Sequence, residues 1–280
     1  MFNVVGYVSM NGLFFHTLLL VYLAASILHV LFLTTGNRRI SQAAYWVTTS
    51  GFVVHSIFIA FHWLRVGHLM AHGYDSTSFL AWAIILIYLC IAHLTRLRTI
   101  GGFVVPAAFI AILVAYTFQT HQDSAVPAYL QSYWLIAHTT AIFVAYAAFV
   151  AAFAFGLMYL IEEKKIRQKQ HTLIYSLLPA LGRSDELGHK CIVVGVILLT
   201  IGIIIGMLWT RYVQEVRWAW VDPKVLFTIA AWLVYMLELG IRRIFGWRGR
   251  KTAYSAIIGF GAVLFTYIGV NLFLPSIHAF

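Results

Sequence analysis

The sequence predicts an all-α fold, a polytopic transmembrane bundle of about eight helices. Of its 280 residues, 62% are hydrophobic and only 10% are charged, which leaves too few charges for the surface of a soluble domain of this length. Hydropathy divides the chain into about eight apolar segments long enough to cross a bilayer. Lysine and arginine gather in alternate connections between these segments, as is typical of multi-pass membrane proteins.

The first apolar segment covers residues 13–33. The residues before it carry no positive charge, and the segment is full length rather than short and followed by a small-residue cleavage site. We therefore expect it to stay as a helix and not to be removed as a signal peptide. Three more segments with short connections follow, at residues 44–64, 78–95 and 102–118.

The second half of the chain holds the other four segments, at residues 133–161, 189–209, 224–245 and 253–274. Two longer connections lie among them. Residues 162–188 combine the charged run EEKKIRQKQ with the moderately apolar LIYSLLPAL, which indicates a helix extension and then an interfacial segment. Residues 209–223 form a tryptophan-rich connection. We expect all eight segments to form one transmembrane domain over residues 1–280.

The basic residues predict the orientation of these segments. Fifteen Lys and Arg residues lie in or beside the connections after the first, third, fifth and seventh segments, and four lie on the other side. Because basic connections face the cytoplasm, we expect both termini on the extracytoplasmic side of the cytoplasmic (inner) membrane. The net charge of +10 therefore comes from basic connections that orient the helices in the lipid bilayer. It does not indicate a nucleic-acid surface, which would need a soluble basic patch.

Twelve histidines are unusual in so apolar a chain, because ionisable groups at membrane depth are costly and are usually paired or functional. His55 lies in the middle of the second segment, and His62 follows seven residues later on the same helix face. His138 lies near the outer end of the fifth segment, and His278 follows the eighth. Each could be a hydrogen-bonded packing residue or a metal ligand.

Two imidazoles from different helices can hold a haem iron from opposite faces. A zinc site is disfavoured because no tight His/Cys/carboxylate spacing such as H-E-x-x-H is present. A proton relay stays open, although Glu238 is the main acidic residue within the segments. Cys90 and Cys191 are expected to be small apolar fillers, and the alternative is a thioether to a haem.

The connection before the seventh segment concentrates aromatic residues, among them Trp209, Trp218 and Trp220. Tryptophans at a membrane surface form an aromatic belt. Beside Asp222 and Pro223, the same rings could also stack against a planar macrocycle.

Several stretches resemble the cytochrome c assembly family, whose members include CcsA, CcmC and the HemX proteins. The stretch W-A-W-V-D-P-K (residues 218–224), followed by T-I-A-A-W-L-V-Y (228–235), is similar to the family's tryptophan-rich haem-handling motif. YWLIAH (133–138) is similar to the start of a helix that carries a haem-ligating histidine. The segment 184–206 and the closing L-P-x-x-H-x-F pattern also look like the family.

The resemblance implies that His138 and His278 are axial ligands of a haem at the outer face, beneath Trp218 and Trp220. Trp209, Asp222 and Pro223 would complete that site. His55 and His62 form a weaker second candidate, so one or two haem b groups are expected, with Cys90 or Cys191 as the residue for any thioether bond.

Three departures from the family pattern favour the HemX-type members. Val221 is inserted before Asp222, Val225 replaces an acidic residue, and Gly240 stands where cytochrome c synthases carry a further histidine. We therefore expect a HemX-like haem-binding protein that conveys haem or electrons, rather than a catalyst. The first alternative is a CcsA-type cytochrome c biogenesis subunit that delivers haem to an apocytochrome. The second is a membrane regulator of a haem-biosynthesis enzyme, acting through residues 162–190.

Overall fold

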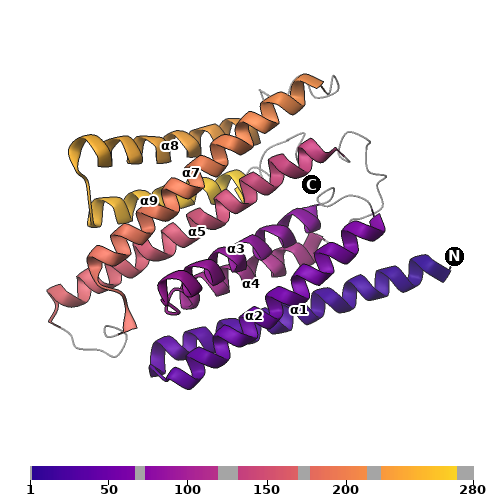
Figure 1. The fold of residues 1–280 in the computed structure, drawn as a ribbon, viewed down its shortest axis with the longest axis horizontal. Helices are drawn as coiled ribbons and strands as arrows, with labels where there is room; N and C mark the ends of the chain where they lie inside the picture. The colour runs from indigo at the N-terminus through magenta and orange to yellow at the C-terminus, as the bar shows by residue number, and fades with distance from the viewer. Residues whose placement is uncertain (1, 67–72, 119–131, 170–176, 213–221, 270–280) are drawn as a thin grey trace. The chain divides into compact units, whose positions relative to one another are not determined.

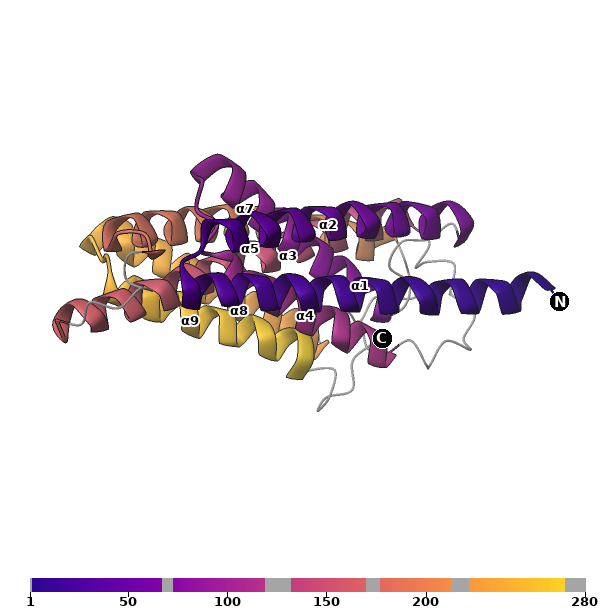
Figure 2. The same cartoon turned by 90° about the horizontal axis from the view of Figure 1, so that it is seen from below.

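The computed structural model describes residues 2–66, 73–118, 132–169, 177–212 and 222–269. Over these ranges the chain is all-helical, with eight helices and no strand. The helices belong to two compact units, residues 1–125 and 126–280. Figures 1 and 2 show the helices of each unit from two directions. The all-α prediction is confirmed, and the single transmembrane domain stays a prediction.

The first unit contains α1 (Phe2–Thr35), α2 (Arg38–Val66), α3 (Gly73–Thr95) and α4 (Gly101–Phe118). Helix α1 packs against α2 and α4, and α3 packs mainly against α4. The α1–α2 turn is tight because Gly36 takes a positive φ of 65°, which glycine adopts without steric cost. The Asn37 side chain then accepts a hydrogen bond from the Arg39 N–H at 2.9 Å and caps the start of α2.

The second unit contains α5 (Tyr133–Arg167), α7 (Leu181–Tyr212), α8 (Pro223–Phe245) and α9 (Arg250–Leu264), which continues into a π-helical turn (Phe265–Gly269). Helix α5 packs most extensively against α7 and also against α9, while α8 and α9 form a hairpin. Figure 1 shows this hairpin in orange and yellow.

Glycines along one face of α7 set its distance from α5. A Cβ atom on Gly195 would lie 2.4 Å from the Phe149 ring, and one on Gly188 would lie 3.3 Å from the Phe155 Cβ. Gly202, seven residues beyond Gly195, faces Ile142 in the same way. Small residues at such spacing let two membrane helices approach closely enough for their backbones to interact.

Among the described residues, six helices are long and apolar enough to cross a membrane, namely α1, α2, α3, α5, α7 and α8, and α4 is a shorter apolar helix. Large apolar side chains such as Leu64 and Ile258 are exposed, as expected where lipid is the solvent. The first seven predicted segments fall on these helices in order and the eighth begins on α9, so the chain is a multi-pass membrane protein. Residues 270–274 of the eighth segment lie outside the described residues.

Most helices extend beyond their predicted segments, and α5 and α7 do so through charged turns. Helix α7 begins at Leu181 rather than near residue 189, and α5 continues to Arg167 rather than ending near residue 161. The physical reason is that hydropathy marks only the part of a helix that lies in hydrocarbon. Charged turns such as those around Asp185 and Lys164 continue the helix past that boundary.

Candidate functional site

His138 lies in the second turn of α5, which starts with Ser132 as its N-cap. The Ser132 side chain accepts a hydrogen bond from the Trp134 N–H at 3.3 Å. This cap fixes where the helix begins, and so fixes the position of the histidine one and a half turns later. The imidazole points toward α7.

The imidazole of His138 is held by the backbone of α7. Its Nδ1 lies 2.7 Å from the carbonyl oxygen of Gly202, and a carbonyl can only accept, so Nδ1 carries the proton. The lone pair of the neutral ring is then on Nε2, the nitrogen that would bind a metal. A carbonyl behind a ligating histidine is a common arrangement in metal sites because it sets the tautomer and the ring orientation.

Gly206 makes room for the His138 ring. A Cβ at this position would lie 2.6 Å from Cε1 and 2.7 Å from Nδ1 of the imidazole, closer than van der Waals contact allows. Sequence reasoning singled out His138 but missed Gly202 and Gly206. The G-x-x-x-G spacing within an apolar segment could have identified both glycines as a site of close helix packing.

Trp209 lies on α7 one turn beyond Gly206 and on the same helix face, because positions 202, 206 and 209 follow the helical repeat. Its side chain is 4% exposed. Within the described part of the chain, its indole N–H has no hydrogen-bond partner. Trp209 therefore presents a buried donor on the face of α7 that carries Gly202 and Gly206. Trp218, Trp220 and His278 lie outside the described residues.

Asp222 and Pro223 begin α8. The Asp222 carboxylate accepts a hydrogen bond from the Lys224 N–H at 2.8 Å, and Pro223 occupies the first helical turn. This is the pattern of a capped helix start. It gives the two residues a structural role that sequence reasoning did not anticipate, and their part in haem binding stays a prediction.

The first unit holds the weaker candidate pair. Both ring nitrogens of His55 are engaged, Nδ1 with the Tyr22 hydroxyl at 3.1 Å and Nε2 with the Ser78 hydroxyl at 3.0 Å. His62 Nε2 lies 3.2 Å from the buried Asp75 carboxylate. Haem ligation by either histidine would require these contacts to break. Their role as ligands stays a prediction.

Cysteine thiols are the remaining candidate ligands for a metal or haem. Cys90 is exposed and Cys191 is partly buried, and both are free thiols. No group of three or more His, Cys, Asp or Glu residues among the described ones could hold a metal ion. This finding leaves a two-histidine site untested, because such a site needs only one ligand on each face of the macrocycle.

Glu238 and Tyr235 are buried polar residues on α8. Neither Glu238 carboxyl oxygen, nor the Tyr235 hydroxyl, has a hydrogen-bond partner among the described residues. The Tyr235 ring stacks on Phe149 with centroids 3.9 Å apart. A buried carboxyl group without a partner is costly as an anion, and Glu238 is the one acidic residue of α8.

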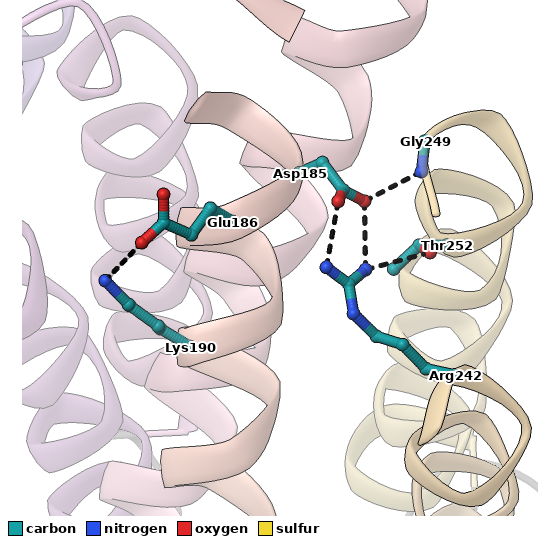
Figure 3. A network of polar contacts seen from close by, with 6 residues as sticks. All are labelled: Asp185, Glu186, Lys190, Arg242, Gly249 and Thr252. Atoms are coloured by element: carbon teal, nitrogen blue, oxygen red, sulfur yellow. Dashed lines mark hydrogen bonds and ion pairs between the residues drawn. The ribbon is translucent and has the colours of Figure 1, made fainter. Parts of the chain in front are cut away.

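A polar network ties together the ends of the helices opposite His138. The Arg242 guanidinium donates to both carboxylate oxygens of Asp185, at 3.0 and 2.8 Å. The Gly249 N–H donates to the same carboxylate at 2.9 Å, and Arg242 also donates to the Thr252 hydroxyl. Figure 3 shows this network joining α7, α8 and α9. Sequence reasoning missed it because its members are far apart in the chain.

A small cavity beside this network has room for only about one water molecule, at about 10 Å³. It is lined by residues of α5, α7 and α9, including Tyr159 and Asp185. It is far too small for a porphyrin. His138 and Trp209, which the sequence predicts to bind haem, lie toward the other ends of α5 and α7.

Comparison with known proteins matches this chain to one family. The sequence model described as "Cytochrome C assembly protein" matches residues 70–278. The chain is 30% identical over 275 residues to the cytochrome c biogenesis protein CcsA of Prochlorococcus marinus (strain NATL1A), covering 88% of this chain and 86% of that protein.

Two further relatives carry the same name. The CcsA of Chlorella vulgaris is 28% identical over 303 residues, covering 92% of this chain and 95% of the relative. The CcsA of Chlamydomonas reinhardtii is 30% identical over 234 residues, covering 80% of this chain and 64% of the relative.

Proposed function

The chain belongs to the cytochrome c assembly protein family, and from this premise we propose that it is a CcsA-type haem delivery subunit of cytochrome c biogenesis. Haem is the cargo in this proposal, and an apocytochrome is the acceptor. The relatives named CcsA align over most of the chain. They support this function over the HemX-like carrier that the departures at residues 221, 225 and 240 suggested.

The observation that carries the proposal is the arrangement of His138. Its Nδ1 is committed to the Gly202 carbonyl, which assigns the lone pair to Nε2. A haem iron bound at that nitrogen would be held by a neutral imidazole in a fixed orientation. The buried indole N–H of Trp209 lies one turn beyond Gly206 on α7 and would serve as a donor to the cargo.

His278 is the proposed second ligand. The Tyr267 ring near the end of the described chain contacts Phe143 of α5, with centroids 5.9 Å apart. Phe143 lies five residues, about 7.5 Å along the helix axis, from His138. The chain thus approaches the His138 end of α5 before continuing toward residue 278. This approach supports ligation by His138 and His278 from opposite faces of one haem b.

We assign this site to the extracytoplasmic face of the cytoplasmic membrane, because the basic connections belong to the opposite end of the helices. An apocytochrome would meet the haem there. The chain's own contribution would be to bind the haem, to orient it through Gly202 and to keep it beside the tryptophan-rich connection until transfer.

The test is complementation in a bacterium from which its own CcsA-type gene has been deleted. We expect the wild-type chain to restore haem-stained c-type cytochromes and His138→Ala to leave them absent, with both chains present at equal levels in the membrane. Maturation by His138→Ala at the wild-type level would refute the proposed role of this residue. Accumulation of haem by the chain with no maturation at all would favour the HemX-like carrier.

A further inference from the structure

The turn between α8 and α9 is strongly basic. Residues 242–251, which we name the α8–α9 turn, read RRIFGWRGRK and contain five cations and no acidic residue. Gly246 and Gly249 have positive φ angles of 65° and 72°, which lets the chain reverse direction within a few residues. The intervening side chains are therefore displayed at one end of the hairpin.

Two of the five cations are satisfied within the protein. Arg242 is turned inward to Asp185 and Thr252, as Figure 3 shows. Arg250 lies 3.8 Å from the Glu163 carboxylate and donates to the Tyr254 hydroxyl.

The other three cations, Arg243, Arg248 and Lys251, are exposed. None of them has a carboxylate partner in the part of the chain that the structure describes. Lys251 instead places its ammonium group 4.7 Å from the centre of the Trp247 ring. The turn thus offers three positive charges for which the described residues supply no carboxylate.

Exposed apolar side chains alternate with these charges. Ile244 is 75% exposed, Phe245 is 71% exposed and Trp247 is 36% exposed. Apolar groups of this size beside unpaired cations suit the boundary between lipid headgroups and acyl chains. The α1–α2 turn is different, because its two exposed arginines, Arg38 and Arg39, follow the polar residues Thr34, Thr35 and Asn37.

We propose that the α8–α9 turn is a binding site for an anionic phospholipid. Arg243, Arg248 and Lys251 bind the headgroup phosphate, while Phe245 and Trp247 pack against the glycerol and the upper acyl chain. Charge attraction alone would make every basic connection equivalent. The alternation of cations with apolar anchors distinguishes this turn. The inference does not depend on haem binding or on cytochrome c maturation.

The test is native mass spectrometry of the purified full-length chain titrated with phosphatidylglycerol or phosphatidylcholine. We expect the wild type to bind phosphatidylglycerol more tightly. Each removed cation should weaken that binding about five-fold, so Arg248→Gln should lose about five-fold and the triple variant R243Q/R248Q/K251Q about a hundred-fold. Phosphatidylcholine binding should not change.

The matched control is R38Q/R39Q, which removes two exposed arginines from the α1–α2 turn and should keep wild-type lipid affinity. Equal affinity of the wild type for the two lipids would overturn the proposal. The proposal would also be overturned if R38Q/R39Q lost as much phosphatidylglycerol affinity per removed cation as the α8–α9 variants do. That result would indicate that anionic lipid is attracted to any basic connection. Displacement of the lipid by millimolar glycerol 3-phosphate would identify a site for soluble phosphate instead.

Discussion

The ring of His138 occupies the space that a side chain at residue 206 would need. Because a Cβ at Gly206 would lie 2.6 Å from the imidazole, the ring and the α7 backbone can be this close only with glycine there. The same contact places Nδ1 on the Gly202 carbonyl. Adding one methyl group at residue 206 of α7 is thus expected to displace the His138 imidazole on α5.

Gly206→Ala should therefore lower haem affinity about ten-fold, in the range seen when the support of a metal ligand is disturbed. Haem per chain, measured by the pyridine haemochrome method after purification, checks this. Gly240→Ala is the matched control, because a Cβ there meets nothing within 4 Å, and it should keep wild-type haem content. Equal haem in the two variants would contradict the role assigned to Gly206.

For His55 we expect a mutation to change stability and not haem content. Its two ring nitrogens bond the hydroxyls of Tyr22 and Ser78, so His55→Ala leaves both hydroxyls buried without their partner, at a cost of about 1–3 kcal/mol each. We expect a lower melting temperature and an unchanged ratio of haem to chain. A ratio that falls by half would instead identify a second haem at this histidine.

The sequence could indicate His138 as a ligand candidate through its depth in an apolar segment. It could not indicate the tautomer, because the carbonyl that fixes it is 64 residues away in the chain. Asp75 was missed as the partner of His62 for a similar reason. It lies in the first turn of α3, beyond a connection whose path the hydropathy does not determine.

At the scale of elements, the start of α8 depends on one side chain. Asp222 caps the helix through the Lys224 N–H, and loss of an N-cap costs about 1 kcal/mol. Asp222→Ala should lower the melting temperature, while Asp222→Ser should retain the cap and most of the stability. Differential scanning calorimetry distinguishes the two. If Asp222→Ser keeps stability but loses haem, the carboxylate itself takes part in binding.

The Asp185–Arg242 pair joins three helices and should matter more. Both side chains are largely buried, and breaking a buried pair by removing one partner costs about 3 kcal/mol or more. Asp185→Asn should therefore lower thermal stability clearly. The adjacent Glu186–Lys190 pair, also drawn in Figure 3, is exposed, so Glu186→Gln should show no measurable change. Equal effects would contradict the structural role of the network.

The order of the helices could be predicted because apolar runs of bilayer length and the alternation of basic connections both appear in the sequence. The beginning of α7 could not, because the turns from Leu181 onward carry charges and fall below any hydropathy threshold. The close packing of α5 on α7 had a visible signal in Gly188, Gly195 and Gly202. Their partners Phe155, Phe149 and Ile142 became known only from the fold.

At the scale of the whole molecule, the family match covers residues 70–278, which include all of the second unit's helices. His138 and the α8–α9 turn belong to opposite ends of that unit. This separation is consistent with a protein that presents haem at one membrane face and is anchored by lipid at the other. The comparisons do not support the HemX-like function expected from three local departures. The relatives named CcsA, which align over most of the chain, favour the alternative.

The most direct test of the central claim is the absorption and electron paramagnetic resonance spectrum of the chain purified with haem. Ligation by His138 and His278 predicts a six-coordinate, low-spin ferric haem in the wild type. Loss of haem or a high-spin signal is expected in both His138→Ala and His278→Ala, with the wild-type spectrum in His62→Ala. A haem-free wild type, or an unchanged low-spin spectrum in His138→Ala, would contradict the account.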